Sequence, residues 1–427
     1  MRLRPADHRG RPGLTFRQQD LLRGRYTAAV ARMERAGIPV HHPLLARLRA
    51  RWPVLRASLI ERVDRDYGVF AGPTFREARW EAWVRSRGIA WPAHESGGLA
   101  LDDNFRAMAV AHPEVAPMWE LRKTLNKLRV DRLAVGRDGR NRTPLRPFAS
   151  KTGRNQPSTS RFIFGGPAWV RSLIIPEPGQ ALAHIDYAQQ EFGIAAALSG
   201  DAAMMAAYAS GDPYLGFAGQ AGAVPSGATG ETHSEQRERF KLCALGIQYG
   251  MGARALALLI GGTEGQAREL IDSHKTVYRR YWDWSRATER EARSSGLMQS
   301  IFGWRLNVRE HTRAGTIRNF PLQANGAEIL RLACCLLMER GILVCAPIHD
   351  AVLIEGPADQ IDEVVAAGQE TMAEAARIVL GGFPLRSDAR VVRYPHRYMD
   401  ERGTRFWEEV CGIMAETRTC AMSGEGT

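Results

Sequence analysis

Two aspartates stand at the ends of apolar segments, where a carboxylate needs a partner. Asp186 follows the apolar residues 181–185, and Asp350 follows residues 342–348 after one histidine. A carboxylate is costly to bury unless it is paired or bound to a metal ion. Mg²⁺ takes one or two carboxylates plus phosphate oxygens and water, and two such ions can activate a hydroxyl and stabilise a leaving pyrophosphate. Taken singly, each residue is more often a strand-end or hairpin-turn aspartate, so the surrounding residues have to decide.

A four-residue repeat supplies the second chemical feature. Arg237, Lys241, Leu245 and Tyr249 follow one another at intervals of four, so a helix presents them along one stripe. Cations at the start of this stripe can hold phosphates, and the aromatic ring at its end can stack on a base. An amphipathic helix packed on the core is the alternative interpretation. The mixture of charged and apolar residues on the same stripe argues against it.

The charge distribution favours a polyanionic partner. The net charge is +12 and the pI about 9.8. Only five of the 58 basic residues are lysines, which leaves 53 arginines and makes codon bias an alternative explanation. The segment 137–171, however, holds eight basic residues and one acid, interleaved with Gly, Pro, Ser and Thr. Such a basic loop can follow a phosphate backbone by releasing counterions.

Composition places the chain among ordinary globular proteins. Apolar residues make up 44% and charged residues 24% of the sequence. The apolar runs are shorter than the roughly 20 residues of a membrane span, and the N-terminus lacks the apolar core of a secretion signal. The six cysteines form no CxxC pair, so core packing is favoured over disulfides or zinc. We therefore expect a cytoplasmic protein without a membrane partner.

Hydrophobic periodicity predicts an α+β chain with a small central sheet and helical lobes before and between its strands. Strands are predicted at 181–185, 342–348, 351–355 and 388–393. Helices are predicted at 25–36, 43–66, 116–134, 189–198, 234–251, 264–296, 322–340 and 358–379. The tight turn between the second and third strands contains Asp350, and residues 211–232 are rich in turns.

Five segments resemble those of the DNA polymerase I (family A) polymerases. Residues 186–192, DYAQQEF, resemble motif A, residues 237–250 resemble motif B, and residues 348–351, IHDA, resemble motif C. The T-G-R at 152–154 and the R-N-x-P-x-Q at 318–323 match two further family segments. All five occur in the family's order and spacing, over about residues 25–410. Some departures resemble a phage or prophage branch of the family.

The resemblance implies a right-hand polymerase fold, with a palm that contains a small antiparallel sheet, helical fingers and a helical thumb. The expected parts are a disordered leader at 1–20, the thumb at 21–135, the palm at 136–200 and 321–414, the fingers at 201–320 and a flexible tail at 415–427. The implied activity is template-directed extension of a primer 3′-hydroxyl by dNTPs, with release of pyrophosphate. We expect a monomer that binds primer–template DNA and lacks a 3′–5′ exonuclease.

The resemblance also implies roles for individual residues. Asp186, Asp350 and the backbone carbonyl of Tyr187 would hold two Mg²⁺ ions, for which Mn²⁺ could substitute. Lys241 would bind the triphosphate and act as general acid, which a lysine can do and an arginine cannot. The remaining nucleotide contacts would be Arg237 on the γ-phosphate, Tyr249 stacking at the templating position, Glu191 as the steric gate against a ribose 2′-hydroxyl, and Gln189, Leu245 and Tyr214.

DNA contacts are implied for a further set of residues. Arg154, Gln323 and His349 would meet the primer–template minor groove and the primer end, where acceptors occur at the same places in every correct pair. Asn319, Arg171, Arg122 and Lys127 complete the expected set. For Arg122 and Lys127, on the basic helix of the thumb, a solvated charged face is nearly as good an interpretation.

The sequence departs from the family at five positions. Ala351 replaces the usual Glu of motif C, so we expect activity with an altered metal preference. Leu245 replaces an aromatic residue, Tyr214 a phosphate-binding His, Glu238 a second basic residue of motif B, and Gly193 an Arg. Two other functions stay open. A single-subunit RNA polymerase is disfavoured by Glu191 and the T-G-R segment, and a catalytically impaired nucleic-acid-binding remnant is suggested by Ala351.

Overall fold

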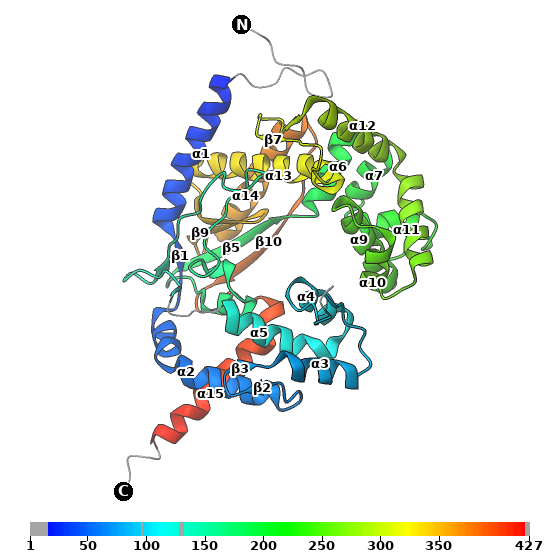
Figure 1. Cartoon of the computed structure of the whole chain (residues 1–427). Coiled ribbons are helices and arrows are strands. Elements are labelled where there is room, and N and C mark those ends of the chain that lie inside the picture. Colours follow the sequence, from blue (N-terminus) through cyan, green and yellow to red (C-terminus); the bar gives the residue numbers. More distant parts are fainter. Residues whose placement is uncertain (1–15, 95–96, 128–131, 423–427) are drawn as a thin grey trace. The chain divides into compact units, whose positions relative to one another are not determined.

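A computed structural model describes residues 16–94, 97–127 and 132–422 (Figure 1). The chain divides into two compact units. The first, which we call the sheet unit, contains Met1–Ala36, Leu145–Gln156 and Gln180–Val391. The second, which we call the helical unit, contains Gly37–Pro144, Pro157–Gly179 and Val392–Thr427. The segments of the two units alternate along the chain, so each unit is built from residues far apart in sequence.

A four-stranded sheet in the order β10-β5-β9-β8 forms the centre of the sheet unit. The strands are β5 (Gln180–Tyr187), β8 (Leu343–Ile348), β9 (Ala351–Pro357) and β10 (Ser387–Arg393). β9 pairs antiparallel with both β5 and β8, and the β8 pairing is irregular between Val344 and Ala346. All four strands were predicted from sequence, and the α+β class is confirmed.

Two long helices pack on this sheet because they and the strands are apolar. α13 (Ala314–Glu339) contacts β8 and α14 (Ile361–Leu380), and α14 contacts β5 and β9 (Figure 1). Ile185 and Ile354 from the strands are fully buried with Leu337 from α13 in one core cluster. Burial of this apolar surface holds the ends of β5 and β9 in fixed positions, which is what the site requires. α1 (Phe16–Ala36) also packs against α13 and β8.

The helices between β5 and α13 differ in part from the prediction. They are α6 (Gln190–Ser199), α7 (Ala202–Ala209), α8 (Pro213–Gln220), α9 (Ser234–Gln248), α10 (Ala253–Ile260), α11 (Glu264–Val277) and α12 (Arg279–Ser295), followed by the hairpin of β6 (Leu297–Gln299) and β7 (Arg305–Asn307). The single helix predicted at 264–296 is wrong. Two helices, α11 and α12, meet at Tyr278 instead. The backbone of Tyr278 is outside the helical region (φ −109°, ψ 53°), and its ring is fully buried in the core.

Three other predicted boundaries also differ. The helix predicted at 322–340 begins eight residues earlier and contains Pro321. The turn-rich segment 211–232 contains α8. Asp212 caps the start of this helix by accepting hydrogen bonds from the amides of Tyr214 and Leu215. Residues 16–20, expected in the disordered leader, form the start of α1. Residues 1–15 of that leader lie outside the described part.

The helical unit is built on helices and short strand pairings. Its helices are α2 (His42–Asp64), α3 (Glu77–Ser86), α4 (Asp102–Ala111), α5 (Ala116–Lys127) and α15 (Thr404–Met422). It has two short antiparallel pairings, the hairpin of β2 (Phe70–Ala71) with β3 (Thr74–Phe75) and the long-range pairing of β1 (Ile38–Pro39) with β4 (Arg140–Asn141). α5 is described as far as Lys127, residues 128–131 of the predicted helix lie outside the described part, and residues 133–134 are not helical. α15 extends through 415–422, which the sequence analysis assigned to a flexible tail.

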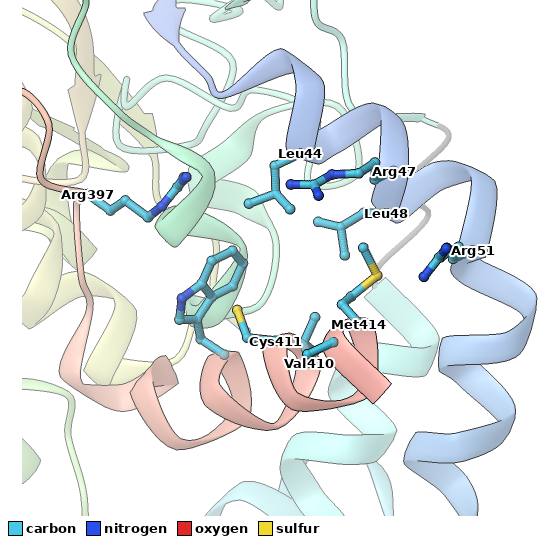
Figure 2. A pocket seen from close by; sticks show the side chains of 10 residues that line it. Leu44, Arg47, Leu48, Arg51, Arg397, Val410, Cys411 and Met414 are labelled. Atoms are coloured by element: carbon cyan, nitrogen blue, oxygen red, sulfur yellow. The ribbon is translucent and has the colours of Figure 1, made fainter. Parts of the chain in front are cut away.

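A hollow of about 380 Å³ lies between α2 and α15 within the helical unit. Figure 2 shows the arginines Arg47, Arg51 and Arg397 around apolar side chains that include Leu48 and Met414. None of the residues predicted to bind metal, nucleotide or DNA lines it.

Two predicted absences can be compared with the described residues. Among these, no helix is long and apolar enough to cross a membrane. Five of the cysteines are described and none of these five is in a disulfide; four of them are buried: Cys243, Cys334, Cys335 and Cys345. The prediction that Cys334 and Cys335 pack in the core is confirmed.

Candidate nucleotide and metal site

Asp186 and Asp350 lie at adjacent ends of neighbouring strands. Asp186 is the last but one residue of β5, and its antiparallel partner on β9 is Ala351. Asp350 precedes Ala351 in the turn between β8 and β9, and its carbonyl accepts a hydrogen bond from the Tyr187 amide (3.4 Å). His349, the other turn residue, has a positive φ of 56°, as the tight hairpin requires. The sheet register thus brings together two residues 164 positions apart in the sequence.

The electrostatics of this pair are unfavourable without a cation. Asp186 Oδ1 is buried and, among the described residues, has no hydrogen-bond partner. Burial, followed by the charges of Asp350 and Asp388, raises the pKa of Asp186 to about 7. Burial also raises the pKa of Asp350, although Arg154 opposes the shift. Two crowded carboxylates with a spare oxygen suit a divalent cation, because its charge offsets both and its remaining ligands can come from phosphate and water.

The protein itself offers fewer ligands than a dedicated metal cage. Within the described residues, no group of three or more His, Cys, Asp or Glu side chains is arranged to hold a metal ion. Ala351, at the position where the family usually has Glu, supplies no carboxylate. The arrangement therefore fits an ion shared between two aspartates and a substrate better than a closed structural site.

Glu191 is the centre of a hydrogen-bonded cluster. The chain leaves β5 through Gln189, which has a left-handed backbone (φ 45°, ψ 48°), and enters α6 with Glu191 in its first turn. The Tyr249 hydroxyl donates to Glu191 Oε1 (2.8 Å), and Gln323 donates both to this hydroxyl (3.0 Å) and to the same carboxylate oxygen. Arg154 Nη2 lies 3.9 Å from Glu191 Oε1. The predicted steric gate Glu191, the predicted stacking residue Tyr249, and the predicted minor-groove contacts Arg154 and Gln323 therefore form one cluster.

Opposing effects act on the pKa of the Glu191 carboxyl group. Burial raises the pKa of its carboxyl group, while the hydrogen bond from Tyr249 and the charge of Arg154 act in the opposite direction. Its Oε2 is buried and has no partner among the described residues. The Tyr249 side chain, in contrast, is 56% exposed at the end of α9. The cluster thus has a buried acid at its base and an accessible aromatic ring at its edge.

Both cations on the α9 stripe have acidic partners. Arg237 Nε donates to Asp212, the residue that caps α8. Lys241 Nζ donates to both oxygens of Glu238, at 3.1 and 3.0 Å. Leu245, the next residue of the stripe, is half-buried. The predicted helix is confirmed, and its residues Arg237 and Lys241 each form an ion pair with an acidic residue.

Tyr214 is buried beside Arg237. It is only 5% exposed, its ring centre lies 6.2 Å from that of Phe192 in an edge-on contact, and the Arg237 guanidinium lies 5.8 Å from its ring centre. Burial raises the pKa of Tyr214 to about 12. Its ring therefore packs in the core next to Arg237, and the phosphate contact of its hydroxyl stays a prediction.

A hollow of about 280 Å³ lies beside Tyr249. It is lined by Lys151, Thr152, Tyr249, Leu306, Gly315, Thr316, Asn319 and Phe320. Asn319 donates to the Gln248 carbonyl (3.2 Å), which ties α13 to the end of α9. Gly250, just beyond Tyr249, has a φ of 76°, and a Cβ there would lie 2.9 Å from the Gly315 Cα. Because the two backbones approach so closely, position 250 requires glycine. The close approach also keeps the hollow next to the Tyr249 ring.

The remaining predicted DNA contacts belong to the helical unit. Arg171 forms a buried ion pair with Asp400 and donates to the Phe164 carbonyl (3.3 Å). The guanidinium of Arg122 lies over the ring of Phe75, 3.8 Å from its centre. Lys127 is the last described residue of α5, and its side chain lies outside the described part. Arg171 and Arg122 thus have contacts inside their own unit, and their DNA contacts stay a prediction.

Sequence reasoning missed two acids at the site. Asp212 holds Arg237, and the signal was the helix-start pattern Asp212-Pro213. Asp388, on β10 next to β5, contributes to the raised pKa of Asp186. Its strand was predicted, but a single sequence does not give the order of strands in a sheet.

Comparison with known proteins agrees with this geometry. The sequence model of DNA polymerase family A matches residues 165–393, more than half of the chain. The chain therefore belongs to DNA polymerase family A. This matched segment contains both aspartates, the Glu191 cluster apart from Arg154, and the whole α9 stripe.

Named relatives come from bacteria and phages. The chain is 28% identical to "DNA polymerase I, thermostable" of Thermus thermophilus over 296 residues, which are 64% of this chain and 35% of that protein. It is 26% identical to DNA polymerase I of Chloroflexus aurantiacus over 381 residues, 81% of this chain and 40% of that protein. A DNA polymerase of Mycobacterium phage D29 is 29% identical over 308 residues, 67% of this chain and 49% of that protein. The chain thus spans less than half of these relatives.

A solved structure shares the fold. The "POL domain of Pol1 from M. smegmatis complex with DNA primer-template and dNTP" aligns with a TM-score of 0.69 and 21% identity, covering 86% of this chain and 69% of that one. The predicted polymerase fold is confirmed by this likeness.

Proposed function

We propose that the protein is a template-directed DNA polymerase that extends a primer 3′-hydroxyl with dNTPs and releases pyrophosphate. The observation that carries the proposal is the position of Asp186 and Asp350 at adjacent strand ends, where Asp186 keeps a buried oxygen without a partner. In a chain of family A, this pair lies in the same unit as a cationic helix stripe and a buried acid. These are the groups that nucleotide transfer requires.

Asp186 and Asp350 would hold Mg²⁺, together with the backbone carbonyl of Tyr187. The Tyr187 ring supports this position because it is buried and its hydroxyl donates to the Met372 carbonyl (2.7 Å), which fixes the strand end. When bound, two Mg²⁺ ions would activate the primer hydroxyl and stabilise the departing pyrophosphate. Mn²⁺ is the expected substitute.

The α9 stripe would bind the triphosphate of the incoming nucleotide. Arg237 is directed by Asp212, and Lys241 lies one turn further along the same helix. Lys241 can donate a proton to the departing pyrophosphate, whereas an arginine there would retain it. Leu245 and Gln189 would contact the nucleotide at either side of this path.

The Glu191 cluster would select the sugar and receive the base pair. Glu191 fills space next to the strand end that carries Asp186, and a ribose 2′-hydroxyl placed against it would lose its hydrogen bonds to water. Tyr249 offers an accessible ring for stacking, but it is tied to Glu191 and Gln323 until a nucleotide enters. Arg154, Gln323, His349 and Asn319 would contact primer–template DNA.

Primer extension with separate dNTP and rNTP mixtures tests this proposal. With Mg²⁺ and a primed DNA template, we expect extension by dNTPs in preference to rNTPs. Preference for rNTPs would make the protein an RNA polymerase. Absence of extension with either mixture, with binding of the primed template intact, would favour the catalytically impaired remnant that Ala351 suggests.

A further inference from the structure

Glu238 is the feature of the site that the proposed reaction does not use. It stands three residues before Lys241 on α9, at a position where the family has a second basic residue. Both of its carboxylate oxygens accept from Lys241 Nζ, at 3.1 and 3.0 Å. Among the described residues, no other partner of the Glu238 carboxylate is recorded. The acid therefore serves the lysine and does not hold any other part of the fold.

The ion pair of Arg237 provides a contrast within the same helix. Its partner Asp212 also accepts hydrogen bonds from the amides of Tyr214 and Leu215, both at 3.2 Å, so this carboxylate is fixed by the start of α8. Glu238 is attached only through its own flexible side chain, and it is 49% exposed, with Lys241 34% exposed. Backbone amides at the start of α8 therefore hold Asp212 beside Arg237, whereas the Glu238 side chain can rotate away from Lys241.

We infer that Glu238 is an internal counter-ion of Lys241 that the triphosphate of an incoming nucleotide has to displace. This inference rests on the proposed function, since it concerns the same phosphate site. Lys241 can direct its ammonium protons to the phosphates only after it gives up both oxygens of Glu238. The displaced carboxylate stays near the phosphates on the same helix turn and repels them. When pyrophosphate leaves, Glu238 can recover Lys241 and so favour product release.

The size of the effect follows from the exposure of the pair. An exposed ion pair of this kind changes an equilibrium by a factor of about 1.5 to 5. A like charge about 6 Å from a phosphate adds a factor of about 2 in a water-like dielectric at physiological ionic strength. Removal of the Glu238 charge should therefore tighten binding of triphosphate and of pyrophosphate by about threefold to tenfold. The chemical step should change less than binding, because Lys241 has already left Glu238 when the triphosphate is bound and Glu238 contacts neither the aspartates nor the Glu191 cluster.

Steady-state kinetics of Glu238→Gln test the inference. We expect the KM for dNTP and the inhibition constant for inorganic pyrophosphate both to fall about threefold to tenfold, with kcat unchanged or lowered by slower release. Asp272→Asn is the matched control, because Asp272 forms the same i,i+3 pair with Lys275 (2.8 Å) on α11 and lies outside the proposed site. This control should leave both constants within twofold of the wild type.

Two results separate failure of the inference from failure of the proposed function. An active wild type whose constants do not fall in Glu238→Gln would overturn the counter-ion role while leaving the polymerase proposal standing. A wild type without extension would overturn the polymerase proposal. In that case, equilibrium titration of both proteins with dTTP still tests Glu238, because tighter binding by the variant supports the inference and equal binding overturns it.

Discussion

Replacement of Asp186 by asparagine should stabilise the metal-free protein while removing its activity. The pKa of Asp186 rises from 3.8 to about 7 in the folded chain. A shift of about 3 units corresponds to about 4 kcal/mol at most, and partial exposure of the group reduces this to about 1–3 kcal/mol. The side chain of asparagine keeps the shape of aspartate and carries no charge, so the variant avoids this penalty.

The sign of the pH dependence follows from proton binding. Because the folded chain holds the Asp186 proton to higher pH than the unfolded chain, stability is lost as pH rises from about 4 to 7, and the penalty is complete above pH 7. The gain from Asp186→Asn should therefore be full at pH 8 and about half as large at pH 5.5. Mg²⁺ should stabilise the wild type and not the variant, because ligand binding favours only the folded state that binds it.

Thermal unfolding in EDTA at the two pH values measures these differences. We expect the apparent melting temperature of Asp186→Asn at pH 8 to exceed that of the wild type by about 2–8 °C. Asp359→Asn, an exposed aspartate beyond β9, is the control and should change little. A variant no more stable than the wild type at pH 8, or a gain that does not shrink at pH 5.5, would refute the idea of a crowded carboxylate pair.

Three further predictions concern other residues. Glu191→Ala should raise ribonucleotide incorporation in primer extension, and an unchanged sugar preference would remove the gate role. Ala351→Glu should lower the Mg²⁺ concentration needed for half-maximal extension by several-fold, because it adds a carboxylate beside Asp186; an unchanged requirement would show that this position does not affect the metal. Arg171→Ala should destabilise the protein by about 1–3 kcal/mol, because it removes one of the two arginines that pair with Asp400 while Arg402 remains. Urea unfolding measures this loss, and loss of DNA binding without loss of stability would contradict the structural role.

Local patterns predicted the elements that carry the site. Apolar runs predicted β5, β8 and β9, and the turn at Asp350 followed from two strands with almost no residues between them. The four-residue spacing predicted α9 because a helix repeats every 3.6 residues. These predictions succeeded because each depends on neighbours in sequence.

Contacts between distant segments could not be predicted in the same way. The bond between Tyr249 and Glu191 joins residues 58 positions apart, and Gln323 is 132 positions from Glu191. Tyr214 carries a polar group suited to phosphate, but its ring is buried in the core of the folded chain. Arg171 looked like part of a basic loop until the fold supplied Asp400 from the end of the chain. In each case, the contacts of the side chain come from segments far away in the sequence.

The central claim is that Asp186 and Asp350 hold the metal ions of a nucleotidyl transfer site. The most direct measurement is Mg²⁺-dependent primer extension by the wild type and Asp350→Asn, with primer–template binding measured by fluorescence anisotropy in the same samples. We predict extension by the wild type, its loss in Asp350→Asn, and binding constants within about twofold of each other. Extension retained by Asp350→Asn, or parallel loss of binding and extension, would contradict the claim.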